Sequence, residues 1–325
     1  MKKILIIGST GQIGSELSVR LRSIYGAESV ICGYYTPPYP EGFFDAGPSV
    51  EINALHIEQI ADTVKRYKID TIYNLVAILS ATAEKYPKLG WDVGIGSLMN
   101  CLDVAREYGC AVFTPSSIGA FGRNTPKDHT PQDTIQRPNT VYGITKVLGE
   151  LVSDYYFERW KVDTRSVRFP GIISSMTLPG GGTTDYAVEI FYKAVAGESF
   201  VCPLKAGTFM DMMYMPDALD AAIRIMEADP NRLIHRNSFN VTSMSFDPEM
   251  IYAEIKKYYP EFQMVYDIDP LRQSIADSWP DCLDDSCARD EWGWEPNFDL
   301  VRTTTDMIKK LQNKLNLHYP PVKRK

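Results

Sequence analysis

The sequence is poor in residue patterns that hold a metal ion or a disulfide framework. Only four histidines occur among 325 residues, and no His-Glu-x-x-His or Cys-x-x-Cys spacing is present. The six cysteines are scattered along the chain: Cys32, Cys101, Cys110, Cys202, Cys282 and Cys287. Those spacings are the usual marks of a zinc site, so we expect no metal centre. We expect reduced cysteines that serve mainly in packing.

Long apolar runs and blocks of like charge are also missing. No apolar segment approaches the roughly 20 residues that a membrane-spanning helix needs. The net charge is −7 and the acidic residues are interspersed, which argues against a nucleic-acid-binding surface. The chain begins directly with a strand-like segment that leaves no room for a signal peptide. We therefore expect a soluble intracellular protein, either cytoplasmic or, if a presequence has been removed, in the mitochondrial matrix.

The pattern that is present is typical of an α/β protein. In the first half, short apolar runs alternate with amphipathic stretches, which predicts a Rossmann-type, doubly wound parallel sheet covered by helices. The predicted strands are Lys3–Ile7, Ser29–Gly33, Val50–Ile52, Thr71–Val76, Ala111–Thr114 and Thr164–Arg168. From about residue 170 the alternation fades, and a smaller, mixed α/β lobe is expected. Its predicted helices are Tyr186–Ala196, Pro216–Ala228, Pro248–Tyr259, Asp285–Trp292 and Leu300–Leu315.

A glycine-rich turn follows the first strand and precedes a helical pattern. It contains Gly8, Gly11, Gln12, Ile13 and Gly14. Such a turn lets the backbone approach a pyrophosphate, and the helix behind it directs free amide groups at that anion. The Gly-x-x-Gly-x-x-Gly spacing is shifted from the best-known dinucleotide fingerprint, and a turn without a ligand is the alternative. The order strand, turn, helix favours a dinucleotide site.

The choice of cofactor depends on the residues after the second strand. Enzymes that use NAD usually carry an acidic residue there, and enzymes that use NADP carry an arginine. This chain has Cys32-Gly33-Tyr34-Tyr35-Thr36, which fits neither pattern. Because no basic residue is available for a 2′-phosphate, we predict NAD, bound by residues 1–170 with some later segments returning to that domain. Residues 171–325 would mainly form the substrate-binding lobe.

A tyrosine and a lysine four residues apart form the main candidate for catalysis. Tyr142 and Lys146 would lie on one face of a helix. A phenol loses its proton only near pH 10, so a tyrosine that acts as a base needs a fixed positive charge, which Lys146 can supply. A surface helix can also carry this pair by chance, but the glycine-rich turn favours catalysis.

With these motifs, the chain resembles the extended short-chain dehydrogenase/reductase superfamily over essentially its full length. In that superfamily a Ser or Thr lies four residues before an aromatic-Gly pair, and the catalytic Tyr follows about two dozen residues later. Ser117, Phe121-Gly122 and Tyr142 match this pattern, which favours Ser117 over Ser116. The resemblance implies that Ser117 orients the substrate hydroxyl, Tyr142 is the base and Lys146 also binds the nicotinamide ribose. It further places Asn53, Ala54, Leu75 and Ala77 beside the cofactor.

Within the superfamily, the chain most resembles the short-chain L-threonine 3-dehydrogenase family. The stretches that carry this resemblance are Leu79–Ala81, Pro115–Ile118, Val141–Lys146, Pro179–Val188, Met212–Asp217 and Ile275–Pro280. The resemblance implies oxidation of L-threonine to 2-amino-3-oxobutyrate with NAD, in a homodimer.

The same resemblance indicates which loops hold the substrate. Ser80 and either Thr183 or Thr184 suit its carboxylate or hydroxyl. Asp185 could face the ammonium group, or it could cap the helix that begins at Tyr186. Trp279 either closes over the substrate or is an ordinary packed side chain.

Two rival functions share the fold. A nucleotide-sugar dehydratase has an Asp-Glu pair after the catalytic Ser or Thr, where this chain has Ile118 and Gly119. Related epimerases carry an Asn and a later Arg that grips the diphosphate; the corresponding positions are Gly171 and Met210. A non-catalytic NAD-sensing module often loses the tyrosine, whereas Ser117, Tyr142 and Lys146 are all present.

Overall fold

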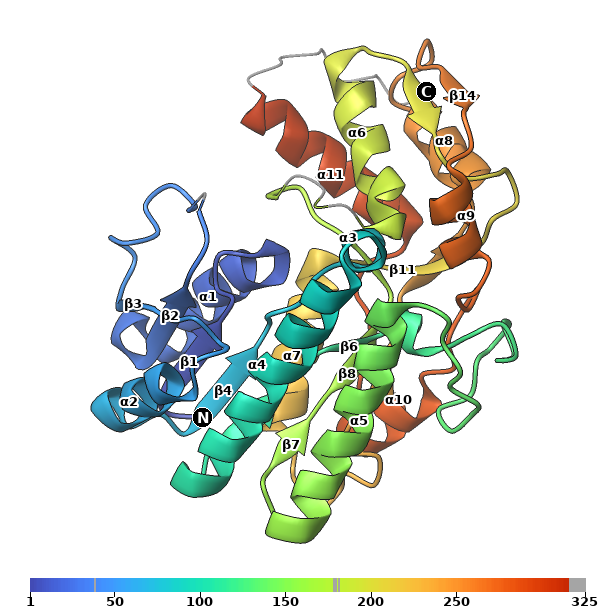
Figure 1. The fold of residues 1–325 in the computed structure, drawn as a ribbon. Helices are drawn as coiled ribbons and strands as arrows, with labels where there is room; N and C mark the ends of the chain where they lie inside the picture. The colour runs from blue at the N-terminus through green and yellow to red at the C-terminus, as the bar shows by residue number, and fades with distance from the viewer. Residues whose placement is uncertain (38, 178–179, 181, 316–325) are drawn as a thin grey trace.

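A parallel sheet forms the centre of the protein. The computed structural model describes residues 1–37, 39–177, 180 and 182–315. Six strands lie in the order β3-β2-β1-β4-β5-β7, and every neighbouring pair is parallel (Figure 1). Their bounds are β1 (Ile4–Ile7), β2 (Val30–Tyr34), β3 (Ser49–Glu51), β4 (Thr71–Asn74), β5 (Ala111–Phe113) and β7 (Thr164–Arg165). The predicted Rossmann-type, doubly wound sheet is confirmed.

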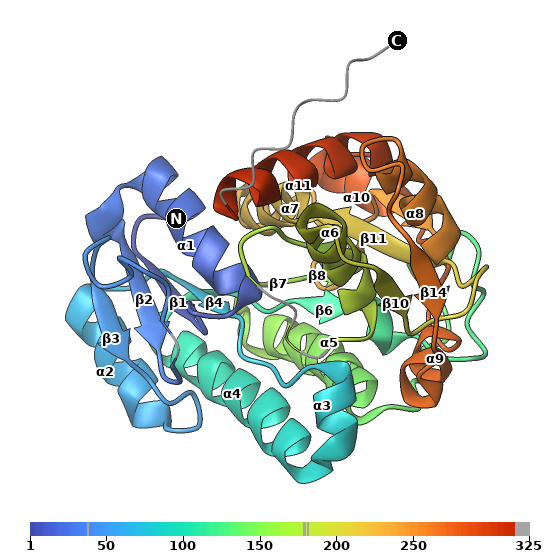
Figure 2. The same ribbon diagram turned by 90° about the horizontal axis from the view of Figure 1, so that it is seen from above.

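Helices cover both faces of this sheet because its strands are apolar on both sides. Ile4 and Ile6 pack in one core with residues of α1 (Gln12–Tyr25) and α7 (Met215–Glu227). The alternate residues Leu5 and Ile7 pack in a second core. That second core holds residues of α2 (Ile57–Tyr67), α4 (Pro87–Tyr108) and α5 (Val141–Trp160), and Figure 2 shows the resulting layers from above. Helix α7 belongs to the second half of the chain, so part of that half packs against the first domain.

The predicted strand Thr164–Arg168 is wrong as a single element. It divides at Ser166 into β7, which pairs with β5, and β8 (Val167–Phe169). Strand β8 pairs instead with β6 (Ser116–Ser117) and β12 (Phe239–Asn240) in a separate sheet. The chain divides in the same way at Pro115, which has no amide to donate to a ladder. The predicted loop after β5 therefore begins with a short strand that contains Ser117.

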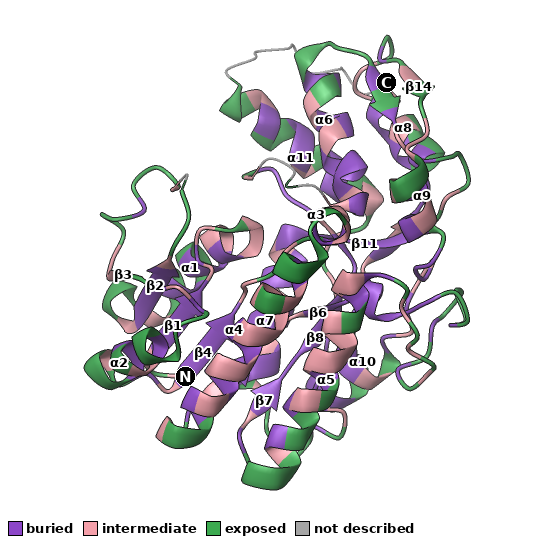
Figure 3. Ribbon diagram, in the orientation of Figure 1, coloured by how far each residue is buried: buried purple, intermediate pink, exposed green. Residues whose placement is uncertain are grey.

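A third core holds the smaller lobe together. It lies between β9 (Gly171–Ile173), β11 (Met210–Tyr214) and β13 (Met244–Phe246) on one side and three helices on the other. Those helices are α6 (Tyr186–Ala196), α8 (Pro248–Lys256) and α11 (Leu300–Lys314), whose inner faces are buried (Figure 3). The remaining elements are η1 (Ala27–Ser29), α3 (Ser80–Lys85), η2 (Ile118–Ala120), η3 (Thr183–Asp185), β10 (Phe200–Cys202), β14 (Met264–Tyr266), α9 (Pro270–Ala276) and α10 (Ser286–Trp292).

The cysteines behave as packing residues. All six are free, and Cys32, Cys101, Cys110 and Cys202 are buried. Burial raises the pKa of the Cys101 thiol to about 12, so this group stays protonated. Among the described residues, no helix combines the length and the apolar character needed to cross a bilayer.

The carboxyl group of Asp211, on β11, is completely buried in the smaller lobe. Asp211 on β11 accepts a hydrogen bond from the Thr242 hydroxyl at 2.6 Å and another from the Leu283 amide at 2.8 Å. Its burial raises its pKa to about 8, although these hydrogen bonds act in the opposite direction. An unfolded chain would hold this proton only below about pH 4.

Stability should therefore fall as pH rises from about 4 to about 8, because unfolding releases a proton that the folded chain keeps. In Asp211→Asn this contribution disappears. The new amide can donate to Thr242 while its oxygen accepts from Leu283. Urea unfolding at both ends of this range measures the difference, and the loss of stability at high pH should be smaller in the variant. Equal losses in the two proteins would show that Asp211 does not titrate in this range.

Candidate active site

A cavity of about 300 Å³ lies where the carboxyl ends of the central strands meet the smaller lobe. This edge is where ligands of doubly wound sheets bind. Most of the residues that the sequence singled out line it: Gly8, Gly11, Gln12, Ile13, Gly14, Leu75, Ala77, Ser80, Ser117, Tyr142, Lys146, Thr183, Thr184, Asp185 and Trp279. Pro179 and Gly181 from the glycine-rich stretch before Thr183 lie outside the described residues.

The glycine-rich turn has the shape of a phosphate cradle. Gly8 has a φ of +84°, which side chains rarely adopt. A Cβ on Gly14 would lie 2.2 Å from the Gly8 carbonyl oxygen, so only glycine permits this close turn. Gly11 begins α1 without a side-chain cap, which leaves the first amides of the helix open to an anion. The pyrophosphate of NAD fits these residues.

Two predicted cofactor residues are not part of the cavity wall. Asn53 and Ala54 follow β3, at the edge of the sheet beyond β2. The Asn53 amide donates to the Tyr35 hydroxyl at 3.3 Å, and the Ala54 carbonyl accepts from Asn100 at 2.9 Å. Tyr35 and Asn53 therefore stand close together where related enzymes use a carboxylate.

The helix that carries Tyr142 approaches the turn after Ser117 very closely. Thr140 caps α5 by accepting a hydrogen bond from the Gly143 amide at 3.0 Å. A Cβ on Gly143 would lie 2.2 Å from the Gly119 carbonyl oxygen. A Cβ on Gly119 would in turn lie 3.0 Å from two ring carbons of Tyr142. A glycine in the first turn of a helix, such as Gly143, indicates that another segment approaches the helix closely. This signal in the sequence could have predicted the contact.

The Lys146 ammonium group lies between Tyr142 and the sheet. Its Nζ donates to the Pro115 carbonyl at 2.7 Å and lies 5.3 Å from the centre of the Tyr142 ring. The distance to the ring is within the range of a cation–π contact. The ammonium group therefore lies beside the Tyr142 ring, and its predicted role in activating the phenol stays a prediction.

The two serines of β6 have different surroundings. Ser116 donates to the carboxylate of Glu150, so its hydroxyl is already used. The Ser117 oxygen accepts from the Gly119 amide at 3.1 Å, which leaves its own proton available for a ligand. These contacts favour Ser117 over Ser116 as a donor to a substrate oxygen.

Polar groups from α3 and the smaller lobe meet across the cavity. The hydroxyls of Ser80 and Thr183 lie 3.3 Å apart and are buried. Asp185 accepts from the Gly182 amide at 2.7 Å and makes no side-chain cap on α6. Of the two alternatives for Asp185, the cap on α6 is therefore not found, and contact with a substrate ammonium group stays a prediction. Trp279 is 5% exposed and belongs to the core of the lobe as well as to the cavity wall.

Two histidines lie beside cysteines that are distant in the sequence, so the spacing of these residues could not predict the contacts. The His129 amide donates to the Cys282 sulfur at 3.1 Å, beside Asp128. His235, Cys287 and Glu291 also bring possible ligand atoms within 4.8 Å of one another. However, one Glu291 oxygen accepts backbone amides and the other pairs with His235. Neither group lines the cavity.

Comparison with known proteins gives a consistent family. The model of the NAD dependent epimerase/dehydratase family matches residues 4–241. An uncharacterised epimerase/dehydratase of Staphylococcus aureus strain MRSA252 is 51% identical over 97% of this chain and 98% of its own length.

Two solved structures are similar throughout. The L-threonine dehydrogenase of Clostridium difficile is 51% identical, with a TM-score of 0.93 over 97% of this chain and 98% of that protein. The holo form of the GalE-like L-threonine dehydrogenase of Cupriavidus necator is 46% identical, with a TM-score of 0.92 over 95% and 99% of the two chains. NAD is the cofactor of the matching epimerase/dehydratase family, and the glycine-rich turn has the shape to bind it. The chain therefore belongs to the NAD-dependent epimerase/dehydratase family, within the extended short-chain dehydrogenase/reductase superfamily.

Proposed function

We propose that the protein is an NAD-dependent L-threonine 3-dehydrogenase, which oxidises the side-chain hydroxyl of L-threonine to give 2-amino-3-oxobutyrate. Family membership and the similar structures support an NAD-dependent oxidoreductase. The observation that carries the choice of substrate is a set of small polar groups, Ser80, Thr183 and Asp185, that line the same cavity of about 300 Å³ as Tyr142. The cofactor would lie on residues 1–170, and residues 171–325 would mainly supply the substrate site.

The hydrogen bonds of Ser117 and Lys146, and the place of Tyr142 in the cavity wall, support the following catalytic roles. Tyr142, as the tyrosinate, takes the proton of the substrate hydroxyl, and Ser117 donates to the same oxygen and holds it in line. The Lys146 ammonium stabilises the tyrosinate and binds the ribose hydroxyls of the cofactor. Bound NAD supplies the acceptor for the hydride that leaves Cβ of the substrate.

The substrate's charged ends need partners because the cavity excludes much of the solvent. The paired hydroxyls of Ser80 and Thr183 suit the carboxylate. Asp185, which is 8% exposed, suits the ammonium group. In this arrangement L-threonine lies with its hydroxyl toward Tyr142 and its amino-acid end toward the lobe.

A nucleotide-sugar substrate is less compatible with the same walls. A Cβ on Gly171 would lie 2.2 Å from the Met212 sulfur and 2.6 Å from Thr184 Cγ2, so the Asn of related epimerases has no room. A Glu at position 119 would press on the Tyr142 ring. The diphosphate would also meet no arginine among the described residues that line the cavity.

An assay across substrates tests the proposed function. NADH absorbance should rise with L-threonine and NAD, more slowly with L-serine, L-allo-threonine and 3-hydroxybutyrate, and not with UDP- or dTDP-sugars. Turnover of a nucleotide sugar in place of L-threonine would overturn the proposal.

Replacement of the base tests the mechanism. Tyr142→Phe removes the oxygen that takes the proton in this arrangement, so kcat should fall about 10²- to 10⁴-fold. NAD affinity should persist because the ring still packs on Gly119. Tyr155→Phe is the matched control, since Tyr155 is 54% exposed on the same helix. Full activity in Tyr142→Phe would rule out this residue as the base. A wild type that shows no turnover would instead favour a non-catalytic NAD-sensing role.

The outer face of α4 and α5 supports a homodimer. Ile144, Leu151 and Tyr155 are exposed and recur at the spacing of one helical face on α5, and Leu89 on the neighbouring α4 is exposed as well. Leu151 is 61% exposed, and a charge at this position would be costly to bury between two copies.

Leu151→Arg should therefore convert a dimer into a monomer, which light scattering after size exclusion detects. Val19→Arg, at a 65% exposed position on α1, should leave the dimer intact. A wild-type monomer, or a dimer in Leu151→Arg, would contradict this interface.

A further inference from the structure

Helix α5 contacts residues 115–119, which include the strand β6 that carries Ser117, at three successive turns. In the first, Tyr142 packs on Gly119, two residues beyond Ser117. In the second, Lys146 donates to the Pro115 carbonyl at 2.7 Å. In the third, Glu150 accepts a hydrogen bond from the Ser116 hydroxyl. The first two contacts involve the proposed chemistry, whereas the third lies one turn away from it.

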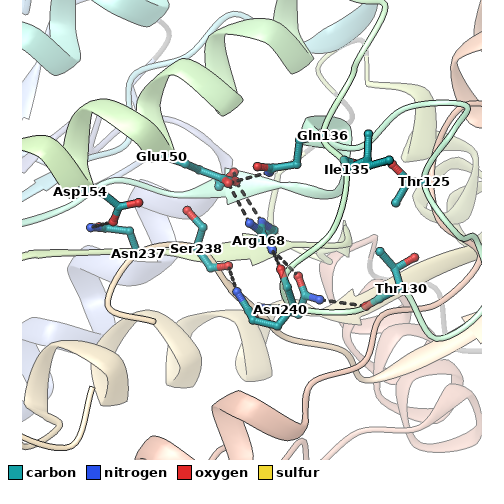
Figure 4. A network of polar contacts seen from close by, with 12 residues as sticks. Thr125, Thr130, Ile135, Gln136, Glu150, Asp154, Arg168, Asn237, Ser238 and Asn240 are labelled. Atoms are coloured by element: carbon teal, nitrogen blue, oxygen red, sulfur yellow. Dashed lines mark hydrogen bonds and ion pairs between the residues drawn. The ribbon is translucent and has the colours of Figure 1, made fainter. Parts of the chain in front are cut away.

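The carboxylate of Glu150 is buried and fully hydrogen-bonded. Arg168 on β8 donates to both of its oxygens, at 3.0 Å and 2.9 Å (Figure 4). Ser116 adds a donor to one oxygen, and Gln136 donates to the other at 2.6 Å. Each oxygen therefore has two donors, and the geometry of the group is fixed from both sides.

Arg168 extends this network beneath β6. It donates to the Gln132 carbonyl at 2.8 Å and to the Asn240 side chain at 3.0 Å. Asn240 in turn donates to the Thr130 carbonyl at 3.0 Å. Glu150 thus joins α5 to β6 directly through Ser116. One guanidinium group joins it to β8, to β12 and to the segment before α5 (Figure 4).

A buried ion pair of this kind is weak support for stability, because desolvation offsets most of the attraction. An apolar pair would hold α5 and β6 together but would allow the helix to slide or rotate. Directional hydrogen bonds to a single carboxylate prevent both movements. A shift of α5 along its axis would move Tyr142 away from Ser117, and misplacement by about 1 Å can cost about 100-fold in rate.

We propose that Ser116 and Glu150 are positioning residues, which set the register of α5 on β6 and thereby hold Tyr142 and Lys146 opposite Ser117. The proposal rests on the proposed function for its kinetic consequences. Neither side chain takes part in proton transfer.

Ser116→Ala tests this role, since it removes one hydrogen bond and leaves the Glu150–Arg168 pair in place. We expect kcat for L-threonine to fall about tenfold with little change in KM for NAD, because ground-state binding persists while alignment is lost. Ser116→Thr, which keeps the hydroxyl and has the cavity beside it for its methyl group, should recover most of the rate.

The matched control is Gln136→Ala. It removes a donor from the other oxygen of the same carboxylate, but Gln136 lies outside the strand that carries Ser117. Its kcat should stay near that of wild type at a similar loss of thermal stability. Wild-type kcat in Ser116→Ala, or equal loss of kcat in the two alanine variants, would overturn the proposal.

Crystal structures of the two alanine variants give a readout that is independent of the substrate. Helix α5 should be displaced along β6 in Ser116→Ala and unmoved in Gln136→Ala. An unmoved helix in Ser116→Ala refutes the positioning role. If wild type does not reduce NAD with L-threonine, the proposed function fails, but these structures still decide the register claim.

Discussion

The close approach of α5 to the turn after Ser117 is the constraint on which the site depends. It exists because Gly143 and Gly119 present no side chain at the point of contact, where a Cβ on Gly143 would lie 2.2 Å from a carbonyl oxygen. The approach brings Tyr142, Lys146 and Ser117 to the same cavity, as the proposed base, its positive partner and the orienting hydroxyl. The cap at Thr140 and the hydrogen bonds of Lys146 and Glu150 then fix the helix along its length.

A second close contact lies within the smaller lobe. Gly171 of β9 lies against Met212 and Thr184. Thr183, Thr184 and Asp185 of this lobe line the same cavity as Tyr142. The same contact leaves no room for the Asn that related epimerases carry at the position of Gly171. In the proposed function, the small polar side chains of the lobe then favour a short polar substrate.

Much of this site could be predicted from the sequence because local rules determine it. The glycine spacing after the first strand and the four-residue interval between Tyr142 and Lys146 each depend on geometry within a few residues. Ser117 is indicated by the motif spacing of the superfamily that the chain resembles. The choice of Ser117 over Ser116 also agrees with the hydrogen bonds, since Glu150 occupies the Ser116 hydroxyl.

Other features could not be predicted because they depend on contacts between distant segments. The division of Thr164–Arg168 between two sheets depends on where β6 and β12 lie. The buried partner of Arg168 lies 18 residues earlier on a helix whose apolar pattern gives no sign of it. The role of Asp185 depends on the turn at Gly182, and the pairing of His235 with Glu291 spans 56 residues.

Transfer of deuterium from substrate to cofactor tests the central claim most directly. With L-threonine labelled at Cβ, the account predicts that wild type places the deuterium on the nicotinamide ring and that Tyr142→Phe, at equal NAD occupancy, transfers almost none. Release of the label into water, or its absence from the nicotinamide ring during turnover, would contradict oxidation at Cβ by the site built around Tyr142.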